Sequence, residues 1–231
     1  MIDLQSARVA IQNVEVLRQF SIRIAPGQMV GLIGRNGAGK TTVMRTIMGH
    51  LPLIEGRLGL GSTDLSATLP HTRAALGIGY MPEDRGLVPE LTVEENICLP
   101  LWAQPTLPLQ QRLDFVYGVL PELLPMRERK ALLLSGGQQK LVALARALTV
   151  GTKLLLLDEP FEGVAPALSQ RLSEVVAGLR GAGMSVLISQ SDLNHSRKLL
   201  DAEVVIERGA NVTPPAPRPT TAIHPPCTSL L

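Results

Sequence analysis

The chain has 231 residues, of which 45% are apolar and 3% aromatic, and its formal net charge is +2. This length suits one large domain or two small ones around a sizeable hydrophobic core. The nearly balanced charge gives no electrostatic case for nucleic-acid binding, and the scarcity of aromatic residues argues against a base-stacking surface.

Hydropathy and cysteine content favour the cytoplasm. No apolar run approaches the roughly 20 residues needed to cross a bilayer, and residues 1–4 do not begin a secretory signal. Cys98 and Cys227 lie far apart in different kinds of sequence. A disulfide or a cysteine-bound metal is therefore not expected, and a reducing compartment fits.

The first part of the chain shows short strand patterns around a glycine-rich loop. We predict strands over residues 2–9, 20–24, 29–33 and 76–81, a turn at 26–27 and a helix over 40–48. Gly49 is suited to end that helix, because glycine readily adopts the left-handed conformation found after a helix C-terminus.

The middle of the chain, residues 91–133, changes to helical stretches that are broken by proline. Apolar residues recur there at helical spacing, which predicts helices with one buried face. These residues are Leu109, Leu113, Val116 and Leu120. We expect a helical subdomain at about 88–133, inserted between two halves of an α/β core.

Strands and helices alternate in the remainder. We predict a helix after Gly137, a strand over 154–157, a helix over 166–180 and strands over 185–189 and 204–206. This alternation is typical of a largely parallel sheet. We expect one domain over residues 1–210. Residues 211–231 include six prolines and are predicted to form a disordered tail.

Residues 34–41 fit the phosphate-loop pattern G-x-x-x-x-G-K-[ST], between a predicted strand and a predicted helix. Its glycines allow backbone N–H groups to surround phosphate oxygens, and the helix N-terminus adds partial positive charge. Lys40 would neutralise the β- and γ-phosphates of a nucleotide, the hydroxyl of Thr41 would bind Mg²⁺, and Thr42 would hydrogen-bond a phosphate. A chance glycine turn is a weak alternative in this context.

Two carboxylates, Asp158 and Glu159, directly follow the apolar run 154–157. Ligands of open α/β sheets bind at the carboxyl ends of the strands, so these side chains are expected beside the phosphate loop. Asp158 is then suited to hold Mg²⁺ through water, and Glu159 to act as general base for an attacking water. An ordinary acidic turn is the alternative, and the phosphate loop makes it a minor one.

A third motif, LSGGQQK at residues 134–140, contributes little to nucleotide binding by a phosphate loop of its own chain. Alone it would be a glycine turn with a serine cap. With the other two motifs, in this order and spacing, it makes residues 2–209 resemble an ABC-type ATPase.

The resemblance implies a P-loop NTPase core of ABC type, with a mostly parallel sheet, an antiparallel β subdomain and a helical insertion. It also implies a head-to-tail dimer, with itself or with a homologous subunit, that encloses two ATP molecules with Mg²⁺. The residues expected to bind ATP within one subunit are Gly34, Asn36, Gly37, Ala38, Gly39, Lys40, Thr41 and Thr42. Those expected to face the partner subunit's ATP are Ser135, Gly136, Gly137 and Gln138.

A finer resemblance is to the ATPases of branched-chain amino-acid importers and of the related urea and amide importers. The segments that carry it are GRNG at 34–37, GYMPEDR at 79–85, LTVEEN at 91–96 and EGVAP at 162–166.

Two departures from the family concern the phosphates. Glu83 stands where most ABC ATPases have a Mg²⁺-sensing glutamine, and a carboxylate can bind the metal beside Thr41 and Asp158. The switch-histidine position aligns with Gln190, which can hydrogen-bond a γ-phosphate but cannot carry positive charge. Gln190 is therefore expected to act at the γ-phosphate, and His195 to be an exposed helix residue.

Two further departures lie elsewhere. Ile11 is near the position where the family stacks adenine on an aromatic ring, and it would lose about 0.5–1.5 kcal/mol of aromatic attraction. Phe161 replaces a small polar residue and would tighten or distort the dimer interface. The C-terminal strand and helix typical of the group are expected to be truncated.

We therefore expect the ATP-binding and ATP-hydrolysing subunit of an ABC transporter. It would power import of an amino-acid-like or urea- or amide-like solute through separate integral membrane permease subunits, on the cytoplasmic face of the inner membrane. One alternative is a soluble ABC ATPase of repair, translation or cofactor assembly. Another is a weakly active subunit paired with a more active homologue, as Ile11, Phe161 and Gln190 would allow. The sequence does not identify the transported substrate.

Overall fold

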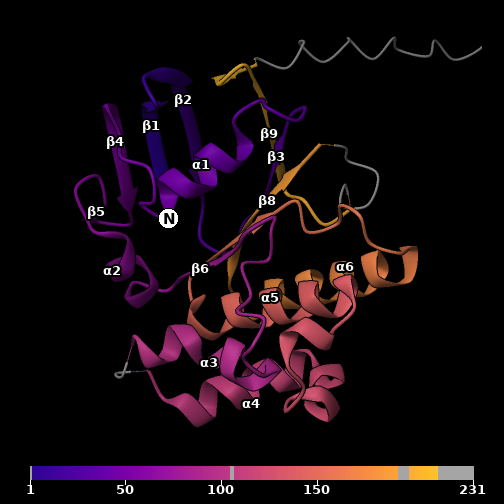
Figure 1. The fold of residues 1–231 in the computed structure, drawn as a ribbon. Helices are drawn as coiled ribbons and strands as arrows, with labels where there is room; N and C mark the ends of the chain where they lie inside the picture. Colours follow the sequence, from indigo (N-terminus) through magenta and orange to yellow (C-terminus); the bar gives the residue numbers. More distant parts are fainter. Residues whose placement is uncertain (1, 105–106, 192–197, 213–231) are drawn as a thin grey trace, which may run out of the picture.

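Two β-sheets and a layer of helices form this computed structural model, which describes residues 2–104, 107–191 and 198–212 (Figure 1). The antiparallel sheet has the order β2-β1-β4-β5, with β1 (Ile2–Ile11), β2 (Val14–Ile24), β4 (Glu55–Leu60) and β5 (Thr63–Asp64). The second sheet has the order β10-β9-β3-β8-β7-β6 and is parallel apart from β10. Its strands are β3 (Met29–Ile33), β6 (Ile78–Met81), β7 (Leu154–Asp158), β8 (Ser185–Gln190), β9 (Ala202–Glu207) and β10 (Ala210–Asn211).

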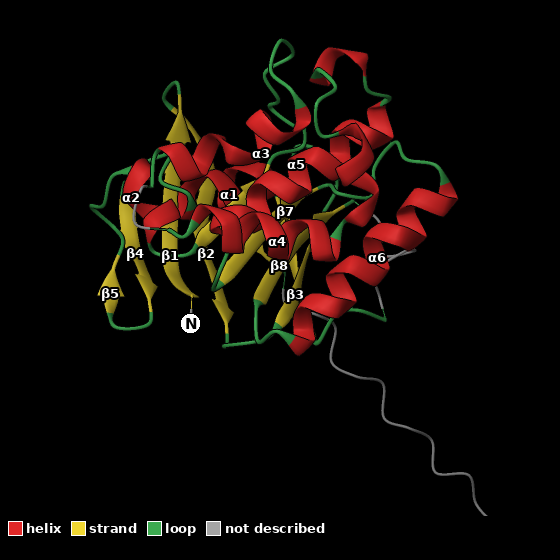
Figure 2. Ribbon diagram, turned by 90° about the horizontal axis from the view of Figure 1, so that it is seen from below, coloured by secondary structure: helices red, strands yellow, loops and turns green. Residues whose placement is uncertain are grey.

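Helices cover both faces of the six-stranded sheet. The first helix, α1, contacts both sheets and lies between them, whereas α3, α4, α5 and α6 form a layer on the other side (Figures 1 and 2). The helices are α1 (Lys40–Ile47), α2 (Pro70–Ala75), α3 (Val93–Trp102), α4 (Leu109–Val119), α5 (Gly136–Val150) and α6 (Pro166–Gly181), with 3-10 turns η1 (Pro121–Met126) and η2 (Ala131–Leu133). In the described part of the chain, no helix is long and apolar enough to cross a membrane.

The pleat of the central strands divides the interior into two hydrophobic cores. In β7, Leu154 and Leu156 pack in the core shared with α1 and the antiparallel sheet, and Leu155 and Leu157 pack in the core of the helical layer. Successive side chains of a strand point to opposite faces, so a strand covered on both sides has to be apolar throughout. All four leucines are fully buried, and burial of each contributes about 1.5–3 kcal/mol.

Several element boundaries differ from the sequence prediction. β2 begins at Val14 rather than at residue 20, and neither β4 nor α2 was predicted. The start of β4 carries Glu, Gly and Arg, which have low β propensity, and pairing with β1 makes it a strand. Residues 88–133 contain α3, α4 and both 3-10 turns.

The folded chain continues two residues past the predicted domain end. Asn211 lies in β10, and its side-chain amide accepts a hydrogen bond from the backbone N–H of Ser21 at 2.7 Å and donates to its carbonyl at 2.8 Å. Asn211 therefore belongs to the folded domain and not to the predicted tail. The rest of that tail, residues 213–231, lies outside the described residues.

Arg73 in α2 is a buried cation that joins α1 to the segment before α2. Only 3% of its surface is exposed, and its guanidinium donates to the carbonyls of Thr46, Ile47 and Leu65 at 2.5–2.8 Å. The last carbonyls of a helix have no partners within the helix, so Arg73 satisfies the end of α1.

We expect Arg73→Met to lower the free energy of unfolding by about 1–3 kcal/mol, because methionine fills part of the space but removes the hydrogen bonds to the carbonyls of Thr46, Ile47 and Leu65. Urea unfolding followed by circular dichroism measures this change. Arg57→Met, at an exposed arginine of β4, is the control and should leave the unfolding midpoint unchanged. Equal midpoints for the two variants would contradict this role of Arg73.

Candidate functional site

The glycine-rich loop joins β3 to α1, as the phosphate-loop pattern predicts. Gly37 and Gly39 have φ angles of +80° and +112°, in the left-handed region that favours glycine. A Cβ at Gly34 would lie 2.4 Å from the carbonyl oxygen of Ile206, so only glycine fits there. The loop and the start of α1 border a cavity of about 350 Å³.

This phosphate cavity is lined by residues from the loop, α1, β2, the segment after β6 and the segment after β7. They are Val16, Asn36, Gly37, Gly39, Lys40, Thr41, Thr42, Glu83 and Glu159. A helix N-terminus with a lysine beside it attracts an anion, so the cavity is suited to phosphate groups. Gly34 and Ala38, which were also predicted to bind nucleotide, belong to the loop but are not among these lining residues.

Lys40 and Glu159 form an ion pair in the phosphate cavity. Nζ of Lys40 lies 3.0 Å from Oε1 of Glu159, and the two side chains are only 5% and 8% exposed. The hydroxyl of Ser191, directly after β8, lies 3.1 Å from Nζ of Lys40 and 2.8 Å from Oε1 of Glu159. The candidate phosphate-binding cation and the candidate base are thus in direct contact, where solvent screens their charges weakly.

The backbone of Glu159 is strained and is held from two sides. Its φ angle is +47°, which for a non-glycine residue costs about 1–3 kcal/mol and persists only where the surroundings fix it. Its N–H donates to Oγ of Ser189 in β8 at 3.0 Å, and its carbonyl accepts a hydrogen bond from Nζ of Lys140 in α5 at 3.0 Å.

Asp158 is fully buried beside the loop. Its carboxylate accepts hydrogen bonds from the hydroxyls of Ser189 at 2.5 Å and Tyr80 at 3.4 Å, and a further one from Thr41. Burial raises the pKa of Asp158, and the hydrogen bonds from Ser189 and Thr41 oppose that change by favouring the carboxylate.

The three predicted metal ligands, Thr41, Glu83 and Asp158, line one space. Burial raises the pKa of Glu83, and the negative charge of Asp158 raises it further. Among the described residues, no group of three or more His, Cys, Asp or Glu side chains could hold a metal ion alone. The oxygen donors present suit a hard cation such as Mg²⁺ that takes further ligands from phosphates and water.

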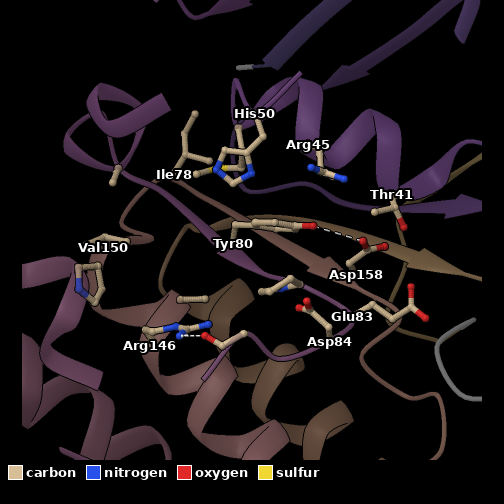
Figure 3. A pocket seen from close by; sticks show the side chains of 16 residues that line it. Thr41, Arg45, His50, Ile78, Tyr80, Glu83, Asp84, Arg146, Val150 and Asp158 are labelled. Carbon is tan, nitrogen blue, oxygen red and sulfur yellow. Dashed lines mark hydrogen bonds between the residues drawn. The ribbon is translucent and has the colours of Figure 1, made fainter. Parts of the chain in front are cut away.

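A groove of about 790 Å³ adjoins the phosphate cavity (Figure 3). In Figure 3 the ring of Tyr80 lies along the groove with its hydroxyl toward Asp158, between Arg45 and His50 on one side and Arg146 on the other. Thr41 and Glu83 line both the groove and the phosphate cavity. A molecule in the groove would therefore lie next to the predicted metal ligands.

The LSGGQQK motif forms the start of α5. The hydroxyl of Ser135 caps the helix by accepting from the N–H of Gln138 at 3.3 Å, and the side chain of Gln138 accepts from the N–H of Ser135 at 3.0 Å. Ser135 and Gly136 are exposed, and Gly137 and Gln138 are half-buried. None of the four is among the described residues that line the phosphate cavity.

Comparison with known proteins identifies the family. Residues 17–162 match the family model described as ABC transporter. The chain is also 34% identical over 197 residues to the high-affinity branched-chain amino acid transport ATP-binding protein BraG of Pseudomonas aeruginosa, and the match covers 85% of this chain and 84% of BraG. The chain belongs to the ABC transporter family.

Other members are similarly close to this ABC ATPase. It is 32% identical over 202 residues to the lipopolysaccharide export system ATP-binding protein LptB of Escherichia coli K12, over 87% of this chain and 84% of LptB. The ADP conformation of MJ1267, an ATP-binding cassette of an ABC transporter, superposes with a TM-score of 0.77 at 28% identity, over 92% of this chain and 89% of MJ1267. The predicted fold class and the ATP hydrolase activity are thereby confirmed, and the chain is the ATPase subunit of a transporter.

Sequence reasoning missed two serines of this ABC ATPase. Ser189 contacts Asp158, and Ser191 contacts Glu159, whereas Gln190 is the buried last residue of β8 between them. Side chains alternate along a strand, so the pleat directs Gln190 away from the face of Ser189. This period of two is the signal that could have identified both serines.

Three other expectations concern single residues. Ile11 is not among the lining residues of the phosphate cavity, because β1 ends there and the chain returns along β2, where Val16 reaches the cavity. Phe161 is 9% exposed and packs in the core of the helical layer of its own chain, and its effect on a dimer interface stays a prediction. His195 lies outside the described residues.

Proposed function

We propose that this ABC ATPase works as a head-to-tail dimer, in which each ATP lies between the phosphate cavity of one copy and the α5 N-terminus of the other. The exposed Ser135 and Gly136 are the observation that supports this arrangement most directly. They present a capped helix N-terminus to solvent, apart from the phosphate cavity of their own chain. Such a terminus attracts an anion, and a partner's γ-phosphate supplies one.

The contact between Lys40 and Glu159 supports a mechanism for ATP hydrolysis. When ATP occupies the cavity, Lys40 turns from Glu159 to the β- and γ-phosphates, which frees the carboxylate to accept a proton from water. The water oxygen forms a bond to the γ-phosphorus as the bond to the β–γ bridging oxygen breaks. We assign the γ-phosphate contact predicted for Gln190 to Ser191, because its hydroxyl already lies beside both Lys40 and Glu159.

Mg²⁺ fits the oxygen donors of Thr41, Asp158 and Glu83. These side chains border the cavity and the groove together, and the bound cation would supply positive charge that stabilises the triphosphate.

The groove is the surface that we assign to an integral membrane permease. Its volume of about 790 Å³ exceeds that of the phosphate cavity, and it shares Thr41 and Glu83 with that cavity. A permease segment seated there would respond to closure of the dimer around ATP, which links hydrolysis to solute movement. The chain would then lie at the cytoplasmic face of the inner membrane.

The solute that we propose is an amino acid or a urea- or amide-like molecule, moved inward. The segments at 34–37, 79–85 and 162–166 and the similarity to BraG support this class. The similarity to LptB, at 32% identity, favours lipopolysaccharide export as the second candidate. The membrane protein that co-purifies with this chain distinguishes the two.

We expect purification of the tagged chain from membranes in mild detergent to recover an integral membrane permease, and Ala74→Trp to prevent that recovery. Ala74 lines the groove, so a tryptophan there fills the space whatever the chemistry of the partner. Ala75→Trp is the control, because Ala75 is the next residue of α2, is exposed and does not line the groove. Recovery without any membrane protein, or equal loss in both variants, would contradict the assignment.

A further inference from the structure

Lys140 is the last residue of the LSGGQQK motif, yet it lies under the surface that the motif presents. Only 4% of it is exposed. Its Nζ donates to the carbonyls of Glu159 at 3.0 Å and Pro160 at 3.2 Å, and to the carbonyl of Glu162. An ammonium group has three N–H donors, so these three carbonyls use all of them.

The three carbonyls belong to the segment that carries the candidate base. Glu159 has a left-handed φ angle of +47°, which the surrounding structure has to maintain. Its N–H is held by Ser189 of β8, and its carbonyl is held by Lys140 of α5. The direction of the Glu159 carboxylate therefore depends on the position of α5.

We propose that Lys140 is a positioning residue that sets Glu159 for the attack of water and transmits movement of α5 to it. The inference rests on the proposed function, because it takes Glu159 as the base and the α5 N-terminus as the contact for the partner's ATP. Ser135 begins the helix that carries Lys140, and both belong to the same motif. The nucleotide held by one subunit thus acts, through Ser135 and Lys140 of the other, on the base of that other subunit's site.

Contacts at the two ends of α5 allow a matched comparison. At its C-terminal end, Arg112 of α4 donates to the carbonyls of Leu148 and Thr149 at 2.5 and 2.8 Å. Like Lys140, Arg112 is a cation that holds carbonyls from a neighbouring element, but its acceptors lie far along the helix from Ser135. The Arg112→Met variant therefore tests whether a loss of stability alone, with Glu159 still held in place, lowers ATP turnover.

The test compares steady-state ATP hydrolysis by Lys140→Met, Lys140→Arg and Arg112→Met in the full chain. We expect Lys140→Met to lower kcat about 10- to 100-fold through misplacement of the base. Its KM for ATP should stay within about twofold, since the phosphate cavity keeps its residues. Lys140→Arg, which retains charge and donors, should restore most of kcat. Arg112→Met should lower the unfolding midpoint and leave kcat unchanged.

If the wild-type protein hydrolyses ATP, either of two results would overturn the inference. One is an unchanged kcat in Lys140→Met, and the other is an equal fall of kcat in Arg112→Met. If Lys140→Met does not fold, Lys140→Gln, which keeps one amide group as donor, decides by the same measurement: an intermediate kcat supports the inference, and a wild-type kcat overturns it. An inactive wild-type protein would contradict the proposed function instead.

Discussion

Replacing Glu159 by glutamine is expected to lower ATP turnover by about 10²- to 10⁴-fold, the usual contribution of a general base. Glutamine has nearly the same shape, so binding of ATP should persist. It also lacks the charge that pairs with Lys40 at 3.0 Å, so Lys40 becomes available to the phosphates. Phosphate release measures the loss of turnover, and size-exclusion chromatography with ATP and Mg²⁺ should show an accumulated dimer.

The control for this variant is Glu174→Gln, which removes an exposed carboxylate of α6. It should leave both turnover and the oligomeric state unchanged. Glu159→Gln with wild-type turnover would contradict the role of Glu159 as base. A Glu159→Gln protein that binds ATP and stays monomeric would contradict the proposed dimer.

The second large effect is expected from a negative charge introduced at position 135. Aspartate and asparagine cap helices about as well as serine, so Ser135→Asp and Ser135→Asn should both keep α5 folded. In the dimer, aspartate would place a negative charge against the partner's γ-phosphate. We therefore expect Ser135→Asp to lower turnover by at least ~10²-fold through this repulsion, whereas Ser135→Asn keeps most of it.

Mixing two inactive variants tests whether Ser135 acts across the dimer. Lys40→Ala damages the phosphate cavity, and Ser135→Asp damages the surface offered to the other subunit. A mixed dimer has one site with both defects and one intact site, so an equal mixture should recover up to about a quarter of wild-type turnover, and less where the damaged site leaves the base of the intact site unset. Turnover of the mixture that stays at the level of the separate variants, although mixed dimers form, would contradict action of Ser135 across the dimer.

The sequence predicted the parts of this site that depend on short contiguous motifs. The loop at 34–41, the carboxylates after β7 and the cap of α5 each lie within a few residues, so their local spacing fixes their geometry. The six-stranded sheet was predictable for a similar reason, because apolar runs such as 154–157 have to be buried on both faces.

The parts that were missed depend on pairing between distant segments. Val16 reaches the phosphate cavity because β2 pairs with β1 over a longer stretch than local propensity indicates. The start of β4 is a strand because of its neighbour and not because of its residues. The partners of Lys140 lie 19 to 22 positions along the chain, and no local pattern indicates them.

The two hydrophobic cores have a consequence for motion during turnover. Each core packs against its own face of the six-stranded sheet, so the helical layer can shift on one face while α1 and the phosphate loop stay packed on the other. Such a shift reaches the phosphate cavity and the groove through polar contacts that extend from α5. Those of Lys140 end on the segment after β7, and those of Arg146 end on the carbonyls of Arg85 and Gly86. A shift of α5 would therefore move the segments after β6 and β7 together, while the core around α1 keeps its packing.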